Sequence, residues 1–349
     1  MELEAHLRSK QLTGKTKLRR RQNMKRGKSY LKHIDPVELS DEGQEVEQAS
    51  SNSTPPVFPF TTKCRPRQFP DSSIPFIDSH CHIDYLFVRE RHFGTFKSFV
   101  ESKDFPKNFS GCVANFCDPP AWGPNQMYED ILAEDGVWGA FGLHPHNASL
   151  WSEKVKNDLI QACRHSKCVA LGEMGLDLGR KTSSKTSSAI ISVQKRAFTD
   201  QILLGLEMKK PFIIHGRGAE KMTFEILKEN VPIEHKIHFH CYGGDLQTAK
   251  RMIDHFPNMF IGVTGLLTYP SASKIREVVK HLPLERLLVE TDAPFMRPKN
   301  AAVVDADSPK ISSPGMGLLV AVKLAEVKKI EIDNVLIQIR KNVSKMYDI

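Results

Sequence analysis

The sequence lacks the features that mark membrane-spanning, secreted and zinc-finger proteins. No apolar run approaches the roughly 20 residues that a membrane-spanning helix needs, and the charged N-terminus does not resemble a secretory signal. The seven cysteines are odd in number and scattered, and no two of them form a CxxC pair. We therefore expect reduced thiols in a protein without membrane association, and neither a disulfide framework nor a zinc finger.

Charge of both signs is present, but it is unevenly distributed. Residues 1–32 contain eleven Lys or Arg against two Glu, a local charge of +9, so the net charge of +8 leaves −1 for the rest of the chain. An acidic stretch at 35–47 follows the basic run at 17–28. Few apolar residues and segregated charge predict a disordered tail over residues 1–72. The basic run predicts either nuclear import, in a protein that is also present in the cytoplasm, or salt-sensitive binding to nucleic acid. The alternative is a solvated tail that has no partner.

From residue 73 onward, short apolar runs alternate with amphipathic, helix-like segments. The predicted strands are Ile74–Asp78, Gly111–Phe116, Val137–Leu143, Cys168–Met174, Pro211–His215, Ile237–His240, Phe260–Thr264 and Leu287–Thr291. With a helical segment after each, they predict an α/β fold, the (β/α)₈ TIM barrel, over residues 73–349. A doubly wound open sheet is the alternative, but no glycine-rich phosphate loop follows the first strand.

Histidines and carboxylates recur at the ends of these strands. His80 and His82 alternate with Cys81, so in an extended chain both imidazoles point the same way and can bind one metal ion. Four further residues that can bind a metal lie at or directly after the ends of later strands: Glu173, His215, His240 and Asp292. Each alone is an ordinary polar strand end. Because the C-terminal strand ends of a barrel share one face, together they predict mixed nitrogen and oxygen coordination of two divalent ions.

Six ordered motifs resemble those of TatD-family metal-dependent nucleases. They are Asp78-x-His80-x-His82, Gly142-x-His144-Pro145-His146, Gly172-Glu173-x-Gly175-Leu176-Asp177, His215-x-Arg217, His240-Cys241-Tyr242-x-Gly244 and Glu290-Thr291-Asp292-Ala293-Pro294. The resemblance covers residues 74–349 and is closest to eukaryotic TatD-domain proteins with a basic N-terminal extension. Gln194 and Gln201 resemble residues of the helix in the family's fifth β/α unit. Gly216 stands where the family usually has Cys or Ser.

The resemblance implies a two-metal site supported by Mg²⁺ or Mn²⁺. Four imidazoles are poor ligands for Mg²⁺ and favour Zn²⁺ or Mn²⁺, so the identity of the ions stays open. The implied ligands are His80, His82 and Asp292 for one ion, His215 and His240 for the other, and Glu173 between the two.

The resulting hypothesis is hydrolysis of phosphodiester bonds in DNA or RNA. Asp292 accepts the proton of a water activated by two cations, Glu173 holds the cations together, and Arg217 offsets charge on the transition state. His144 and His146 are predicted to contact a substrate phosphate; a third ion or loop packing are the alternatives. We expect a monomeric 3′→5′ exonuclease acting on single-stranded ends. The rival hypotheses are a metal-dependent hydrolase of an aminoacyl ester, amide or lactone, and a non-catalytic nucleic-acid-binding protein.

Four further polar residues near these motifs receive supporting roles. Asp78 and Glu290 lie two residues before predicted ligands and are expected to orient ligand imidazoles. His238 is expected in the barrel interior, and Asp177 is expected to order the loop after Glu173.

Overall fold

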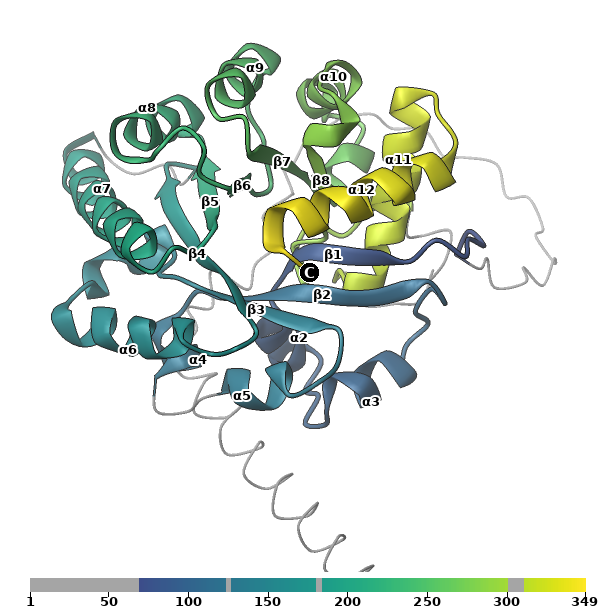
Figure 1. Cartoon of the computed structure of the whole chain (residues 1–349), viewed down its shortest axis with the longest axis horizontal. Coiled ribbons are helices and arrows are strands. Elements are labelled where there is room, and N and C mark those ends of the chain that lie inside the picture. The colour runs from purple at the N-terminus through teal and green to yellow at the C-terminus, as the bar shows by residue number, and fades with distance from the viewer. Residues whose placement is uncertain (1–68, 124–126, 180–183, 301–310) are drawn as a thin grey trace, which may run out of the picture.

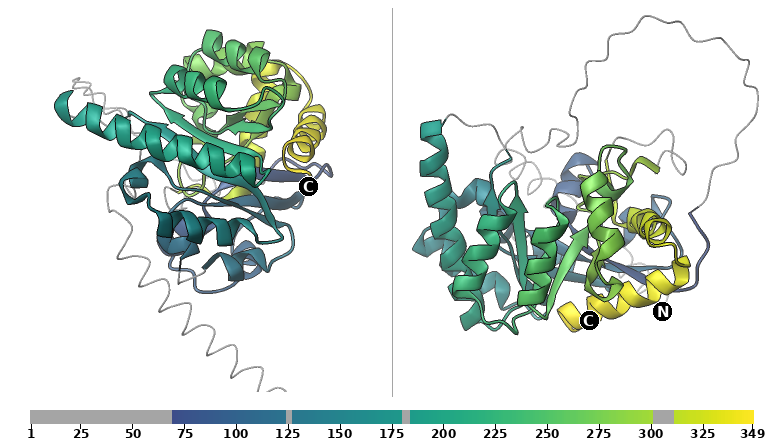
Figure 2. Two further views of the ribbon diagram at one scale, coloured as in Figure 1. Left: turned by 60° about the vertical axis from the view of Figure 1, so that its left-hand side comes forward. Right: turned by 90° about the horizontal axis from the view of Figure 1, so that it is seen from above.

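Eight parallel strands in sequential order form one sheet in the described part of the chain, and helices surround it (Figures 1 and 2). The strands are β1 (Phe76–Cys81), β2 (Phe109–Phe116), β3 (Val137–Phe141), β4 (Cys168–Asp177), β5 (Phe212–Arg217), β6 (Ile237–Phe239), β7 (Met259–Val263) and β8 (Leu287–Val289). The sequential order confirms the predicted (β/α)₈ barrel, because in a doubly wound sheet the order of the strands along the sheet reverses at one point.

The helices cover the outside of this barrel and close one of its ends. The α-helices are α2 (Ile83–Arg89), α3 (Phe96–Glu101), α4 (Pro119–Trp122), α5 (Met127–Leu132), α6 (Glu153–Cys163), α7 (Ser184–Glu207), α8 (Glu220–Asn230), α9 (Leu246–His255), α10 (Ser273–His281), α11 (Gly317–Lys328) and α12 (Ile332–Tyr347). The 3₁₀ turns are η1 (Pro145–Leu150), η2 (Gly265–Thr268), η3 (Leu284–Arg286) and η5 (Pro314–Met316). The left view of Figure 2 shows α7 as a long helix that extends past the barrel.

This computed structural model describes residues 69–123, 127–179, 184–300 and 311–349. All but the last four residues of the predicted 1–72 tail lie outside the described ranges, so the tail and its boundary stay predictions. None of the helices in those ranges is long and apolar enough to cross a bilayer.

Hydrogen bonds from side chains close the seam between β1 and β8. Thr291 donates to Asp78 twice, from its backbone N at 2.9 Å and from Oγ1 at 2.5 Å. Ser79 Oγ donates to the carbonyl of Val289 at 3.0 Å. Asp78 therefore joins the two ends of the sheet. It also accepts from His80 N at 3.3 Å, and its predicted role in orienting a ligand imidazole stays a prediction.

Apolar side chains fill the end of the barrel opposite to the strand C-termini. The strands contribute Ile77, Val113, Ala140, Ala170, Ile213, Phe260 and Leu288, and α12 contributes Val343, Met346 and Tyr347. Asn342 anchors α12 by donating from Nδ2 to the carbonyls of Leu284 at 2.8 Å and Leu287 at 2.7 Å. Because this end is packed and covered, a substrate can reach the interior only from the face on which the predicted ligands lie.

Candidate metal centre

Four donor atoms lie at nearly equal spacing where β1, β4 and the segment after β8 meet. His80 Nε2 and His82 Nε2 are 3.3 Å apart. They lie 3.3 and 3.5 Å from Glu173 Oε2, and 3.5 and 3.3 Å from Asp292 Oδ1. A tetrahedral site with metal–nitrogen bonds of about 2.0–2.1 Å has edges of roughly 3.3–3.4 Å. We call these four residues the first metal group, since their donor atoms fit the ligand shell of one divalent ion.

The end of β1 holds two of these donors in place. The strand continues to Cys81, three residues beyond its predicted end, and His82 directly precedes α2. Cys81 Sγ points the other way, toward the carbonyl of Val113 at 3.6 Å, as the strand alternation predicted. Asp292 N donates to the carbonyl of His80 at 3.0 Å, and His82 N donates to the carbonyl of Ala293 at 2.7 Å. The barrel seam thereby fixes Asp292 beside the two imidazoles.

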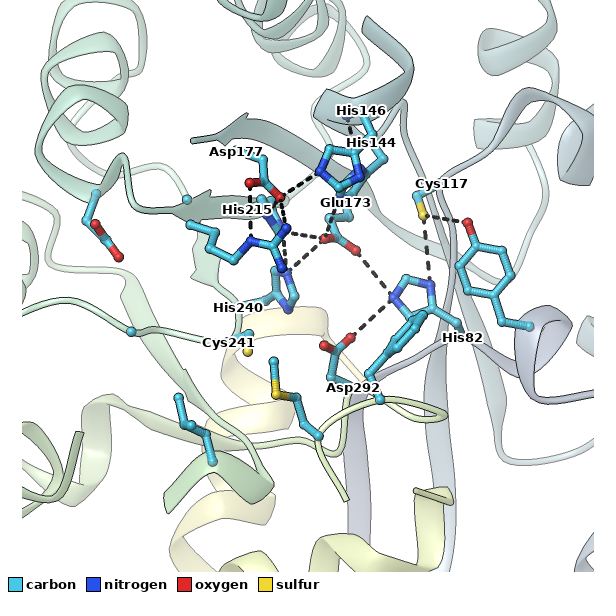
Figure 3. A pocket seen from close by; sticks show the side chains of 18 residues that line it. His82, Cys117, His144, His146, Glu173, Asp177, His215, His240, Cys241 and Asp292 are labelled. Carbon is cyan, nitrogen blue, oxygen red and sulfur yellow. Dashed lines mark hydrogen bonds and ion pairs between the residues drawn. The ribbon is translucent and has the colours of Figure 1, made fainter. Parts of the chain in front are cut away.

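A second set of donors lies on the other side of Glu173 (Figure 3). His215 Nδ1 and His240 Nε2 lie 2.7 and 2.9 Å from Glu173 Oε1, and 3.0 Å from each other. We call Glu173, His215 and His240 the second metal group. Glu173 is 2% exposed, and its Oε2, which faces the first group, has no hydrogen-bond partner among the described residues. A buried carboxylate with one oxygen in each group fits the predicted bridge between two ions.

The electrostatics of the centre favour bound cations. Burial raises the pKa of Glu173, but the neighbouring His240 and hydrogen bonds with imidazoles outweigh it and hold that pKa well below its ordinary value. Burial also raises the pKa of Asp292, and hydrogen bonds with the β1 imidazoles outweigh it and lower that pKa. Burial lowers the pKa of His215, but Asp177 and Glu173 outweigh it and raise it to about 9. The carboxylates are thus ionised, and cations compete with protons for the imidazoles.

Both metal groups open into one pocket with an empty volume of about 890 Å³. All three predicted substrate-binding residues, Arg217, His144 and His146, line it. His144 Nδ1 accepts a hydrogen bond from His146 N at 3.1 Å, and burial and the neighbouring His215 lower the pKa of His144. A neutral imidazole that accepts at Nδ1 carries its proton on Nε2, so His144 can donate into this pocket. A ring nitrogen of His144 also lies within 4.8 Å of ligand atoms of Glu173 and His215, and of His146 and Asp177, as the alternative of a third ion requires.

The barrel that carries this site matches a known protein family. The sequence profile of the family described as TatD related DNase matches residues 77–348. The chain belongs to the TatD-related DNase family. The predicted resemblance is thereby confirmed, and the match spans the whole barrel, from β1 to α12.

Several TatD relatives align with this barrel. The chain is 41% identical over 276 residues to the human 3′-5′ RNA nuclease TATDN2, covering 78% of this chain but 35% of TATDN2, so it spans about a third of that relative's length. It is 33% identical over 169 residues to the 3′-5′ ssDNA/RNA exonuclease TatD of Klebsiella pneumoniae, covering 47% and 60% of the two chains. The solved structure of YjjV, a TatD homologue of Escherichia coli, superposes with a TM-score of 0.67 at 26% identity, covering 80% and 100%.

Asp177 is a TatD-motif residue with more contacts than the sequence analysis foresaw. Its Oδ2 lies 2.9 Å from His146 Nε2, 3.2 Å from His215 Nε2 and 2.8 Å from Arg217 Nη2. The expected loop-ordering contact is present as well, since Gly179 N donates to Oδ1 at 2.9 Å. Because Asp177 holds Nε2 of His215, the Nδ1 of that ring is left facing Glu173.

Helix α7 supports this arrangement through two glutamines. Gln194 accepts from Asp177 N at 3.0 Å and donates to the Asp177 carbonyl at 3.2 Å. Gln201 makes the same pair of bonds to Leu143, at 2.7 and 3.2 Å, directly before His144. The backbone at two strand ends of the site is therefore held by one helix, which gives a physical reason for these glutamines in the TatD-like sequence pattern.

Glu290 lies deeper, next to both metal groups. One of its oxygens and one ring nitrogen each of His80 and His240 lie within 4.8 Å of one another. His238 Nε2 is 3.0 Å from Glu290 Oε2, and Cys241 N donates to Oε1 at 2.5 Å. His238 is fully buried, as expected. The placement of Glu290 fits its predicted role in orienting ligand imidazoles, which stays a prediction.

Proposed function

We propose that this chain is a metal-dependent 3′→5′ exonuclease that hydrolyses phosphodiester bonds at single-stranded ends of DNA or RNA. The observation that carries the proposal is the placement of two donor groups on the two oxygens of the buried Glu173, at the open end of a barrel whose other end is packed. The names of two relatives, a 3′-5′ RNA nuclease and a 3′-5′ ssDNA/RNA exonuclease, support the reaction and its polarity.

The residues divide the reaction between them. Two divalent ions, when bound, supply an acidified water and positive charge at the phosphoryl group. Asp292 has its Oδ1 in the first metal group, where a carboxylate can accept the proton of such a water. Arg217, held by Asp177 at 2.8 Å, and the Nε2–H of His144 line the pocket as donors for phosphoryl oxygens. Glu173 keeps the two ion sites at a fixed separation.

The other predicted properties belong to the same proposal. We propose two ions chosen from Mn²⁺, Mg²⁺ and Zn²⁺, with the four imidazoles favouring Mn²⁺ or Zn²⁺. We also propose that the chain acts as a monomer. The basic run at residues 17–28 supports a nuclear location.

The test is to incubate the purified chain with 5′-labelled single-stranded RNA and DNA, with and without added Mn²⁺ or Mg²⁺. We expect a ladder that shortens from the 3′ end and disappears with a chelator, while a circular strand of the same sequence is resistant. A circular strand that is cut as fast as the linear one would overturn the exonuclease assignment. Turnover of an aminoacyl ester without turnover of either strand would instead support the carbonyl hydrolase.

A further inference from the structure

The pocket has two chemically different walls beside the metal groups. Arg217 and His146, both held by Asp177, form a polar wall next to His215. Four other residues line the same pocket: Tyr85, Leu266, Phe295 and Met296. We call these four the apolar wall. Nothing in the proposed chemistry of the phosphodiester bond uses them.

Phe295 ties the apolar wall to the first metal group. Its backbone N donates to the carbonyl of Asp292 at 2.8 Å. Its ring centroid lies 6.0 Å from that of His82 and 6.1 Å from that of Tyr85, and both pairs meet edge to face. Figure 3 shows His82 and Asp292 at the opposite end of the cluster from Asp177 and His146. Phe295 and Tyr85, which both contact the His82 ring, therefore lie at the end of the cluster away from Asp177 and His146.

Close packing between η2 and the segment after β8 determines the positions of Leu266 and Met296 in the apolar wall. A Cβ on Gly265 would overlap the carbonyl oxygen of Met296, so only glycine allows η2 to approach the segment after β8 this closely. Leu266, the next residue in η2, is thereby placed beside Met296. Phe295, Leu266 and Met296 are all partly exposed, so they present apolar surface to the pocket and are not buried core residues.

We propose that the apolar wall is a subsite for the base of the 3′-terminal nucleotide. The inference rests on the proposed nuclease function and adds to it where the departing nucleotide binds. Each nucleotide carries a planar base beside its phosphodiester, and aromatic side chains can stack on the face of any base. The Arg89 guanidinium, 5.1 Å from the Phe295 ring centroid, adds positive charge next to this subsite.

The apolar floor of strand residues and α12 leaves no exit beneath the metal groups, so a strand enters and leaves by the open face. In the proposed exonuclease reaction, the nucleotide beyond the scissile bond is the last one of the strand, and its base is the one that can reach the apolar wall.

The experiment compares three versions of one 5′-labelled strand, in RNA or DNA, whichever the wild type degrades faster. One ends in adenine, one has an abasic terminal nucleotide, and one has an abasic penultimate nucleotide. For the wild type we expect kcat/KM for removal of the last nucleotide to fall on the order of 10- to 100-fold with the abasic terminus, and much less with the penultimate one. Phe295→Ala should lose a similar factor on the adenine strand and little more on the abasic terminus.

Two variants separate stacking from a structural effect. Phe295→Trp keeps an aromatic face and should recover much of the rate on the adenine strand. Ile337→Ala removes an equally apolar, 40% exposed side chain from α12, on the packed end, and should behave as the wild type. As a readout besides activity, a terminal 2-aminopurine behind a phosphorothioate linkage should be quenched on binding to the wild type and not to Phe295→Ala.

Several results would overturn the subsite. Equal wild-type rates with adenine and abasic termini would do so, as would a larger loss from the penultimate abasic nucleotide. An equal loss for Phe295→Ala on both termini would show that the side chain acts through Asp292 and not through a base. If the wild type degrades no strand at all, the proposed function fails, and the subsite fails with it. If the wild type degrades the strands at a rate that does not depend on the terminal base, only the subsite is rejected.

Discussion

The two metal groups share Glu173 but are built differently. In the first group, the spacings between donor atoms are 3.3–3.5 Å, long for hydrogen bonds and close to the edges of a tetrahedral ligand shell. In the second group they are 2.7–3.0 Å, which are hydrogen-bond lengths. The first group is therefore already spaced for a cation, whereas the second must give up hydrogen bonds among its own members when an ion binds.

The supports of the two groups differ in the same way. The first group is held largely by backbone: the β1–β8 seam fixes Asp292, and His82 Nδ1 contacts the carbonyl of Asn115 at 3.2 Å. The second group depends on a side chain, because Asp177 holds His215 through Nε2. The geometry of the first group thus follows from the fold. The geometry of the second group can be disturbed by a single substitution of Asp177. This difference predicts that the first site binds metal more tightly.

The largest effect should come from Glu173→Gln, because Glu173 belongs to both groups. The variant keeps the shape and removes the negative charge that holds two cations close together. We expect activity to fall on the order of 10²-fold or more, by analogy with the loss of a key charge-stabilising group, and added metal should not restore it. The measurement is the cleavage rate during a Mn²⁺ titration, with folding checked by circular dichroism. Recovery to near wild-type rates at high metal would contradict the bridging role.

A smaller effect is expected from changes that remove one group at a time. His80→Ala and His240→Ala should each lower bound metal to about one ion per chain, with a rate that excess Mn²⁺ partly restores. His80→Ala should remove the tighter site and His240→Ala the weaker one, as measured by calorimetry and by metal content after dialysis. If both variants lose the same site, or both lose all bound metal, the division into two groups is wrong.

A still smaller effect is expected from a substitution that disturbs the support of the second metal group and not that of the first. Asp177→Asn removes the charge that holds His215 and Arg217 but leaves every proposed ligand in place. We expect about 10-fold weaker binding of the second ion, as is usual for partners of metal ligands, and unchanged binding of the first. Asp348→Asn is the matched control, because Asp348 pairs with Lys236 at 2.7 Å and is exposed at the end of α12. Equal weakening of both ions would show that Asp177 supports the whole site and not one group.

The sequence predicted what strand topology decides. His80 and Asp292 lie far apart in the chain, yet both follow strands, and the ends of parallel barrel strands must meet on one face. It did not predict contacts that depend on the packing of neighbouring units. The Phe239 ring fills the space where a Cβ on Gly216 would lie, which accounts for glycine at that position and cannot be read from either segment alone.

The same limit applies to the further contacts of Asp177 and to the apolar pocket residues, which the sequence analysis did not predict. The acidic Asp177 at the end of β4, four residues after Glu173, was a usable signal, but its three partners come from other strands and loops. Leu266 and Phe295 have no such signal, because an apolar residue in a loop looks the same whether it lines a pocket or covers a core.

The smallest effect on chemistry is expected from deletion of residues 1–68, which should leave both metal groups equally intact. This segment carries the basic run, whose charge attracts any phosphate backbone regardless of sequence, so its loss should weaken binding to long strands and flatten the salt dependence of that binding. Turnover of a short oligonucleotide should stay near the wild-type value, because every proposed ligand lies in the barrel. The measurement is the slope of log affinity against log salt for a long strand, beside kcat on a short one. A well-folded truncated chain that binds two ions but no longer cleaves the short strand would place part of the active site in the tail.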